Sequence, residues 1–162
     1  MSELSDLSMS NPSMLIDGFG TPAYSLIVPH LYQGAFPDWY AIPDDVKVVV
    51  SCSTGAPPFV SDRQHIHCPF DDDVIIPDKT KHRILQTAAW VGSFVREKTT
   101  VLVHCRAGIN RSSLITALAI KYIKPDVRMS TIIELIRTNR DKACLMNEEF
   151  ERYLYKFERG EW

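Results

Sequence analysis

A cysteine and an arginine six residues apart are the pair in this sequence whose types and spacing best suit a chemical task. Cys105 follows the apolar run 101–103, and Arg111 precedes the long apolar stretch 114–123. The short run predicts a strand covered on both faces, and the long stretch predicts a buried helix. The residues between Cys105 and Arg111 therefore form a tight loop from the end of a strand to the start of a helix.

This loop has the features of an oxyanion site. Backbone N–H groups between residues 106 and 111 can curl into a concave nest at a helix N-terminus, where the helix dipole favours anions. Gly108 permits a positive φ and close approach of the backbone to a ligand. Arg111 can hold two phosphoryl oxygens in a bidentate fork. Cys105 would lie at the floor of the nest, where the dipole and the arginine favour its thiolate. The sequence thus predicts a nucleophile and an oxyanion clamp in one loop.

These residues resemble the signature of the cysteine-dependent protein phosphatases, His-Cys-x5-Arg-Ser/Thr. The signature stands here as His104, Cys105, Arg106, Ala107, Gly108, Ile109, Asn110, Arg111 and Ser112. The short chain and further landmarks resemble the dual-specificity branch. These landmarks lie at residues 27–34, 69–72, 137–140 and 145–150, so the resemblance covers roughly residues 24–157. A buried cysteine with a structural role is the alternative, and it leaves the glycine, the arginine and the serine of the signature unexplained.

The resemblance implies a role for each part of the loop. Cys105 would attack phosphorus and form a cysteinyl-phosphate intermediate, while Arg111 and the amides of residues 106–110 would hold the phosphoryl oxygens. Ser112 would donate a hydrogen bond to the Cys105 sulfur, or it would only satisfy backbone groups at the helix start.

The two residues that flank the cysteine have other expected roles. His104 leaves the strand on the face opposite Cys105, so we expect it to orient the loop and not to act as a general base. Arg106 would point outward and add positive charge at the rim of the pocket, unless it is simply a surface arginine.

A thiolate that attacks a phosphate ester expels an alkoxide, which needs a proton from a carboxylic acid on the far side. The resemblance implies an aspartate upstream of the cysteine, often within Pro-x-x-Asp at the end of a strand. Here Asp72 follows Pro69 in that pattern and lies 33 positions before Cys105. We favour Asp72 as the acid. Asp73 is an alternative, which counting back from Pro77 would favour, and Asp71 is a third candidate. The two aspartates that are not the acid would lie in a solvated turn.

Length and composition limit the class of protein. A chain of 162 residues suffices for one domain with one core, and 45% apolar with 23% charged residues indicates a globular protein. The net charge of −2 argues against nucleic-acid binding through bulk charge. No apolar run approaches a membrane span, and the first residues do not form a secretory signal. We expect a flexible arm at residues 1–22 and one catalytic domain at 23–162.

The four cysteines are scattered without the spacing of a metal site, as expected for reduced thiols in the cytoplasm. They are Cys52, Cys68, Cys105 and Cys144. We expect Cys52 to be a small core residue, and whether it or Cys68 is a redox partner of Cys105 stays open.

Further strands are predicted at residues 24–28, 31–33, 46–50 and 64–68. A turn at residues 36–40 would feed a short helical stretch, and the loop 51–58 is a candidate wall of the site. His65 and His67 would share one face of their strand. No third ligand is near them in the sequence, so we expect packed or solvated histidines there and no metal site.

Three more helices are expected to cover the sheet. The first opens at Pro77 and Asp78, and its core stripe consists of Ile84, Ala88, Val91 and Val95. Before the second, Thr131-x-x-Glu134 has the pattern of a capping box, with Ile132, Leu135 and Ile136 facing inward. Asn147 is expected to cap the last helix, whose buried stripe is Phe150, Leu154 and Phe157.

Together these features predict an α/β fold with a central, mostly parallel, twisted sheet flanked by helices on both faces. The expected function is hydrolysis of phosphotyrosine and phosphoserine or phosphothreonine in proteins, without a metal or organic cofactor. The expected partner is a phosphorylated protein or peptide, with no nucleic acid and no membrane, and the chain is expected to be a monomer. One alternative is an RNA 5′-phosphatase of the same fold, because Asn110-Arg111 resembles the loop of RNA triphosphatase domains. The other is a phosphate-binding scaffold without turnover.

Overall fold

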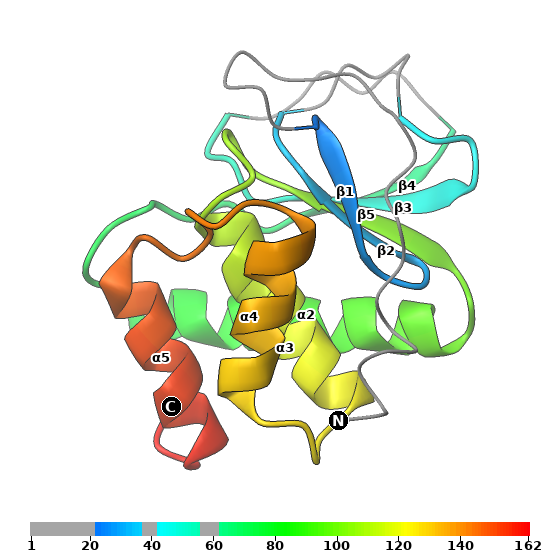
Figure 1. Cartoon of the computed structure of the whole chain (residues 1–162). Helices are drawn as coiled ribbons and strands as arrows, with labels where there is room; N and C mark the ends of the chain where they lie inside the picture. Colours follow the sequence, from blue (N-terminus) through cyan, green and yellow to red (C-terminus); the bar gives the residue numbers. More distant parts are fainter. Residues whose placement is uncertain (1–21, 37–41, 56–61) are drawn as a thin grey trace.

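The computed structural model describes residues 22–36, 42–55 and 62–162, and its centre is a five-stranded sheet (Figure 1). The strands are β1 (Tyr24–Val28), β2 (Leu31–Gly34), β3 (Val46–Ser51), β4 (Gln64–His67) and β5 (Thr100–His104). Their order in the sheet is β1-β2-β5-β3-β4. β1 and β2 pair antiparallel, and the other three pairs are parallel. All five predicted strands are confirmed, with ends that differ by one residue at most.

β5 is the central strand and is buried along its whole length. Val101 and Val103 belong to the core between the sheet and the helices, together with Cys105. Leu102 belongs to a second apolar cluster, with Tyr24, Tyr32 and other residues of the opposite face. Because side chains alternate along a strand, His104 leaves on the face opposite Cys105, as the sequence predicts.

Four helices are described: α2 (Asp78–Arg96), α3 (Arg111–Ile123), α4 (Met129–Asn139) and α5 (Glu148–Glu158). Figure 1 shows all four on one side of the sheet. The sequence predicted helices on both faces, whereas within the described ranges they cover one face only. The helical stretch expected at residues 36–40 lies outside the described residues except for Phe36. The predicted arm at residues 1–22 lies outside them except for Pro22.

α3 is the helix around which the other three pack. Every residue from Ser112 to Ile120 is buried, which confirms the helix expected from an apolar stretch with no polar face. α3 packs against α2, α4 and α5, and also against β2 and β5. The loop 105–111 is therefore held between the central strand and the central helix.

The predicted core stripe of α2 is confirmed, since Ile84, Ala88, Val91 and Val95 are all buried. α5 begins as predicted at Asn147, whose Oδ1 accepts a hydrogen bond of 3.1 Å from the Glu149 amide. Phe150 and Leu154 of α5 are fully buried, as expected. Phe157 is only partly buried, because it packs at the edge of the core beside Trp162.

The capping box predicted at Thr131 and Glu134 is wrong. α4 begins earlier, at Met129, with Arg128 at the N-cap position and no side-chain cap from that residue. Instead, the Glu158 carboxylate at the end of α5 accepts a hydrogen bond of 2.5 Å from the Met129 amide. A carboxylate that is distant in the sequence thus accepts from a free amide at the start of α4, in place of the local side-chain cap that the sequence pattern predicts. The inward face of α4 is confirmed, since Ile132, Leu135 and Ile136 are all buried.

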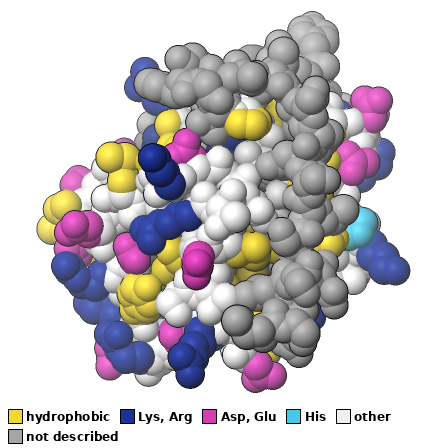
Figure 2. Space-filling view, viewed as in Figure 1, with side chains coloured by type: hydrophobic (Ala, Val, Ile, Leu, Met, Phe, Trp, Pro, Cys, Tyr) yellow, Lys and Arg dark blue, Asp and Glu magenta, His cyan; other side chains and the backbone are white. Residues whose placement is uncertain are grey.

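The surface carries charges of both signs. Figure 2 shows Lys and Arg side chains interspersed with Asp and Glu over the helical part of the molecule, in keeping with a net charge of −2. Within the described ranges, no helix combines the length and apolar character needed to cross a membrane.

The burial of His104 makes the fold sensitive to acid. This side chain has no exposed surface, and burial is the largest cause that lowers its pKa from 6.5 to about 4. Above pH 6.5 the ring is neutral in both the folded and unfolded chain. Between pH 6.5 and 4 only the unfolded chain binds the proton, so the free energy of unfolding falls as pH falls, by about 3 kcal/mol in all.

We expect His104→Gln, which does not titrate, to lose less stability than the wild type between pH 7 and 5. Urea unfolding at a series of pH values measures this difference. Equal losses in the two proteins would contradict the assignment of the acid sensitivity to His104.

Candidate active site

A cavity of about 610 Å³ opens where β5 ends and α3 begins. Its loop-derived lining consists of Cys105, Arg106, Ala107, Ile109, Asn110 and Arg111. Ala35 enters from the end of β2, Asp72 from the segment after β4, and Met146 from the connection before α5. The structure therefore brings the predicted nucleophile, the predicted oxyanion arginine and the favoured acid to one cavity.

Four consecutive carbonyl oxygens of the loop, those of residues 106–109, accept hydrogen bonds from the surrounding structure. The Arg106 oxygen accepts from the Phe36 amide at 3.1 Å, and the Ile109 oxygen accepts from the Leu145 amide at 3.0 Å. The Ser113 hydroxyl also donates to the Ile109 oxygen, at 2.6 Å. These contacts come from the residues after β2, from the connection between α4 and α5, and from the first turn of α3.

Two buried polar side chains hold the carbonyls in the middle of the loop. Gln33 Nε2 donates to the Gly108 oxygen at 3.1 Å and to the Ser113 hydroxyl at 2.7 Å. Arg140, only 5% exposed, donates through Nε to the same Gly108 oxygen at 3.2 Å and through Nη2 to the Ala107 oxygen at 3.3 Å. The guanidinium is itself fixed by Ser25 Oγ at 3.2 Å.

This arrangement determines where the loop amides point. In a planar trans peptide the N–H is antiparallel to the preceding C=O. Since the carbonyls of residues 106–109 face outward, the N–H groups of residues 107–110 face the other way, toward the cavity. The anion nest expected from the sequence is thus built by outward hydrogen bonds.

Gly108 is required by its surroundings. Its φ is +70°, and a Cβ at this position would lie 2.5 Å from the Gly34 carbonyl carbon and 2.6 Å from the Gly34 oxygen. Gly34 is equally confined, because its own Cβ would lie 2.6 Å from the Ala23 oxygen. The positive φ predicted for Gly108 is confirmed, and the close approach is to the end of β2.

Cys105 and Ser112 are in contact at the base of the cavity. Cys105 Sγ and Ser112 Oγ are 3.3 Å apart and hydrogen bonded, and both residues are buried. When the sulfur is a thiolate, the hydroxyl is the only possible donor of this pair. The first turn of α3 contains no acidic residue, so nothing in it offsets the positive end of the helix dipole beside the sulfur.

Arg111 is anchored at the far wall of the cavity. Its Nη1 donates to the Phe70 carbonyl oxygen at 3.2 Å. Phe70 lies in the Pro69-x-x-Asp72 segment, so the oxyanion arginine and the acid segment touch each other. Arg106 is exposed and lines the cavity, at the rim position expected from the sequence.

The three candidate acids differ in orientation. Asp72 lines the cavity with Cys105. Asp73 Oδ1 accepts from the Val74 amide at 2.7 Å, which uses the side chain to close its own turn. Asp71 lines a neighbouring cavity of about 360 Å³, together with Ile75, and does not line the cavity of Cys105. Orientation thus favours Asp72 over the two alternatives.

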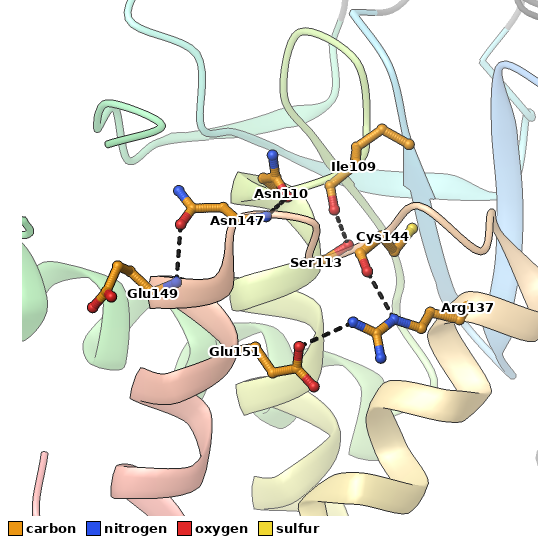
Figure 3. A network of polar contacts seen from close by, with 8 residues as sticks. All are labelled: Ile109, Asn110, Ser113, Arg137, Cys144, Asn147, Glu149 and Glu151. Carbon is orange, nitrogen blue, oxygen red and sulfur yellow. Dashed lines mark hydrogen bonds and ion pairs between the residues drawn. The ribbon is translucent and has the colours of Figure 1, made fainter. Parts of the chain in front are cut away.

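Two asparagines hold the Asp72 carboxylate. Asn110 Nδ2 donates to Oδ2 at 2.8 Å, and Asn147 Nδ2 donates to Oδ1 at 2.7 Å and to the Asp73 carbonyl at 3.1 Å. The asparagines are joined to each other, because the Asn147 amide donates to Asn110 Oδ1 at 3.0 Å (Figure 3). Asn147 is also the cap of α5, through the Glu149 amide that Figure 3 shows.

Arg137 of α4 contacts both the segment before α5 and α5 itself. Arg137 Nε donates to the Cys144 oxygen at 2.9 Å, and Arg137 Nη2 pairs with Glu151 at 3.1 Å (Figure 3). Leu145 adopts a φ of +63°, and its amide donates to the loop at Ile109. The segment that carries Asn147 is therefore tied to α4 through Cys144 and to the loop through Leu145.

The other cysteines lie in the core beside the site. Cys52 and Cys68 are buried and free. Burial raises the pKa of the Cys52 thiol well above its usual value, and the nearby charges of Cys105 and Cys68 raise it further. Cys52 is therefore a neutral thiol near Cys105, in the core position expected for it.

No cluster of three or more His, Cys, Asp or Glu side chains within the described ranges could hold a metal ion. The ring of His67 contacts the Ser53 carbonyl at 3.2 Å through Nε2. His65 is partly buried, and burial followed by the charge of Arg63 lowers its pKa. The candidate wall at residues 51–58 is described only as far as Gly55.

Sequence reasoning missed Gln33, Arg140 and the second role of Asn147. A glutamine on the buried face of a short apolar strand is a signal that could have been noticed, because such a group needs partners. Arg140 gives no local signal, since an arginine at the end of a helix is ordinary. The sequence predicts that Asn147 caps α5. The Nδ2 group of a capping asparagine is still free to donate a hydrogen bond, and this second contact was not predicted.

Comparisons with known proteins identify a family and several structures of the same fold. The family model described as dual specificity phosphatase, catalytic domain, matches residues 32–160. Comparison with curated protein sequences finds no match.

Several solved structures share the fold. Human DUSP28 is 18% identical, over 91% of this chain and 98% of that chain, with a TM-score of 0.74. The human tyrosine phosphatase-like serine/threonine/tyrosine-interacting protein is 16% identical, over 84% and 95%, with a TM-score of 0.70. OH1 from the Orf virus, a tyrosine phosphatase, is 22% identical, over 91% and 90%, with a TM-score of 0.65.

The family model covers most of the chain and includes both Cys105 and Arg111. This protein belongs to the dual specificity phosphatase catalytic-domain family, within the cysteine-dependent protein phosphatases.

Proposed function

We propose that this protein hydrolyses phosphotyrosine and phosphoserine or phosphothreonine in proteins through a cysteinyl-phosphate intermediate. One observation supports it most directly: Cys105, Arg111 and Asp72 line a single cavity whose loop amides point inward. The cavity offers a nucleophile, donors for the phosphoryl oxygens and an acid for the leaving group.

In the first step the Cys105 thiolate attacks phosphorus, the S–P bond forms and the P–O bond to the substrate breaks. Asp72 gives its proton to the departing oxygen, while Arg111 and the loop amides stabilise the phosphoryl oxygens. In the second step the Asp72 carboxylate takes a proton from water as the water oxygen attacks phosphorus. The S–P bond breaks, inorganic phosphate leaves, and the Ser112 hydroxyl donates a hydrogen bond to the sulfur.

The surroundings of the cavity favour a protein substrate. Phe36 and Met146, which flank the loop, are 47% and 69% exposed, so the mouth offers apolar surface beside the phosphoryl site. Arg106 and Arg111 are the cations among the described lining residues. An RNA 5′-triphosphate carries more negative charge than these two cations offset, whereas an aryl or alkyl phosphomonoester beside an apolar side chain matches the mouth.

Neither alternative has an observation of its own in its favour. Asn110, the residue that resembles RNA triphosphatase domains, donates here to the Asp72 carboxylate, and a carboxylate beside the cysteine supports the phosphomonoester reaction. A scaffold without turnover needs neither a thiol nor an acid, whereas Cys105 and Asp72 both line the cavity. Comparing specificity constants for phosphopeptides and triphosphate-ended RNA separates the two enzymatic functions.

Replacing the nucleophile tests the covalent mechanism. We expect Cys105→Ser to abolish turnover of an aryl phosphate in the presence of a chelator, while the fold and binding of an oxyanion such as tungstate are retained. The reason is that an alcohol is far less ionised than a thiol at neutral pH. Steady-state rates and binding calorimetry measure the two properties. More than a few per cent of wild-type activity in a clean preparation would exclude the covalent route, and a wild type without turnover would leave only the scaffold.

Replacing the acid should have an effect that depends on the leaving group. Asp72→Asn should reduce turnover of an alkyl or tyrosyl phosphate by about 10²-fold or more, and turnover of an activated aryl phosphate much less. It should also flatten the alkaline limb of the pH–rate profile, because that limb reports loss of the proton from the acid. Asp73→Asn is the matched control in the same segment and should preserve the limb. The opposite pattern would identify Asp73 as the acid, and two unchanged profiles would exclude this segment.

Asn147 should contribute to the same step without touching the substrate. Asn147→Ser keeps an oxygen that can cap α5 but removes the amide that holds Asp72. We expect about a tenfold loss with a tyrosyl phosphate, little loss with an activated aryl phosphate, and a nearly unchanged thermal midpoint. Asn147→Ala, which also removes the cap, should lower the midpoint as well. Equal losses for both substrates would mean that Asn147 supports only the fold.

A further inference from the structure

A second cavity lies at the other end of the sheet from the active site. It has a volume of about 270 Å³ and lies between the turn from β1 to β2, the end of α2 and the end of α3. Its walls include Val28, Val95 and Ile120, which are 3%, 8% and 1% exposed. Figure 1 shows the β1–β2 turn and the loop from α2 to β5 side by side at this end of the sheet. The floor of the cavity is therefore apolar and fixed by the core.

The rim of this cavity is basic. His30, Arg96, Lys98 and Lys124 line it, and its described lining contains no aspartate or glutamate. None of the four forms an ion pair within the described part of the chain. Arg96 donates to the Tyr122 carbonyl at the end of α3, which is an ordinary use of a cation at a helix C-terminus. Within the described ranges, the ammonium groups of Lys98 and Lys124 form no hydrogen bond to the protein and no ion pair.

Two of the basic residues occupy positions where glycine is usual. Lys98 has a φ of +62° and follows α2, with hydrogen bonds from the Lys98 amide to Val95 and from the Thr99 amide to Phe94. That is the C′ position of a Schellman motif. His30 has a φ of +69° after Pro29 in the two-residue turn, where a type II turn favours glycine or asparagine. Both side chains are thus held at a conformational cost, and both line the same cavity.

We infer that this cavity is a docking site for an acidic segment of a partner protein that inserts one apolar side chain between the basic residues. The apolar floor accepts the inserted side chain, and Lys98 and Lys124 meet the acids on either side of it. A volume of about 270 Å³ is below the range typical of cofactor and drug-sized ligand pockets, which favours a single side chain. The excess of cations over anions at the rim excludes a basic segment.

The docking site is separate from the catalytic cavity. The Val101 amide, at the start of β5, donates to the His30 oxygen at 2.8 Å, whereas Cys105 follows the other end of the same strand. The five residues of β5 span about 17 Å. A docked segment therefore leaves the active site open, and the inference is independent of the proposed function.

The test uses the full chain and the peptide acetyl-Gly-Asp-Glu-Phe-Glu-Asp-Gly-amide at up to about 1 mM, which detects weak docking. We expect the amide NMR signals of Val28, of His30 and of residues 95–98 and 120–124 to shift on titration. The double variant Lys98→Gly with Lys124→Gln should bind about three- to tenfold more weakly, as expected for two exposed ion pairs. Its turnover of a small aryl phosphate should be unchanged.

Lys98→Gly alone provides a control for folding, because glycine relieves the positive φ. Its thermal midpoint should rise by about 2–4 °C while peptide binding falls, so weaker binding cannot be attributed to unfolding. Peptides with Ser in place of Phe, or with Asn and Gln in place of the acids, should bind several-fold more weakly.

Three results would overturn the inference: no shifts at about 1 mM peptide, equal binding to the double variant, or shifts confined to the catalytic cavity. A fourth result concerns residues 1–23 of this chain, which precede β1 and contain Glu3, Asp6 and Asp17 but no Lys or Arg. If Asp17→Asn shifts the same amides without peptide, and the peptide does not bind, the occupant is this segment and not a partner protein.

Discussion

The candidate active site depends on the hydrogen bonds that four consecutive carbonyl oxygens, those of residues 106–109, accept from the surrounding structure. A loop of seven residues cannot direct its amides into a cavity unless its carbonyl oxygens have partners on the outside. Gln33 and Arg140 supply the central partners, and both are buried, so no water competes for them. Without these donors the buried Gly108 oxygen would be unsatisfied in the interior, at a cost of about 1–3 kcal/mol. The anion nest and the folding of the surrounding core are therefore a single cooperative structure.

The candidate acid, Asp72, is positioned by a different set of contacts, which begins at the C-terminal helix. Asn147 caps α5, and its amide group reaches Asp72 and Asp73 in the segment after β4. Asn110 makes the second bond to the same carboxylate from within the Cys105 loop. Three segments that are distant in the sequence thus meet at one carboxylate. Because each asparagine contacts two of these segments, the geometry between Cys105 and Asp72 depends on the packing of α5 as much as on the loop.

The strands, the order of helices and the pair Cys105 and Arg111 could be predicted because their signals are local. Short apolar runs define strands, and the spacing of the signature defines the loop. The acid could be narrowed only to three neighbouring aspartates, since side-chain orientation within a turn depends on what the turn packs against. Gln33 and Arg140 were missed because their partners are 75 and 32 residues away. The capping box at Thr131 was wrong for the same reason, because Glu158 reaches Met129 across 29 residues.

Asn147 both caps α5 and binds Asp72, so it couples displacement of the Asp72 segment to fraying of the first turn of α5. If the segment of Asp72 swings away from the cavity, Asn147 loses two of its acceptors, and the first turn of α5 keeps its cap but loses its tether. Conversely, fraying of that turn would leave the Asp72 carboxylate with Asn110 as its remaining asparagine donor. The amide protons at the start of α5 should therefore exchange with solvent at a rate that follows the opening of the active site, although none of them lines the cavity. Binding of a ligand in the catalytic cavity would then change the rate of hydrogen exchange at the start of α5, a helix that the ligand does not contact.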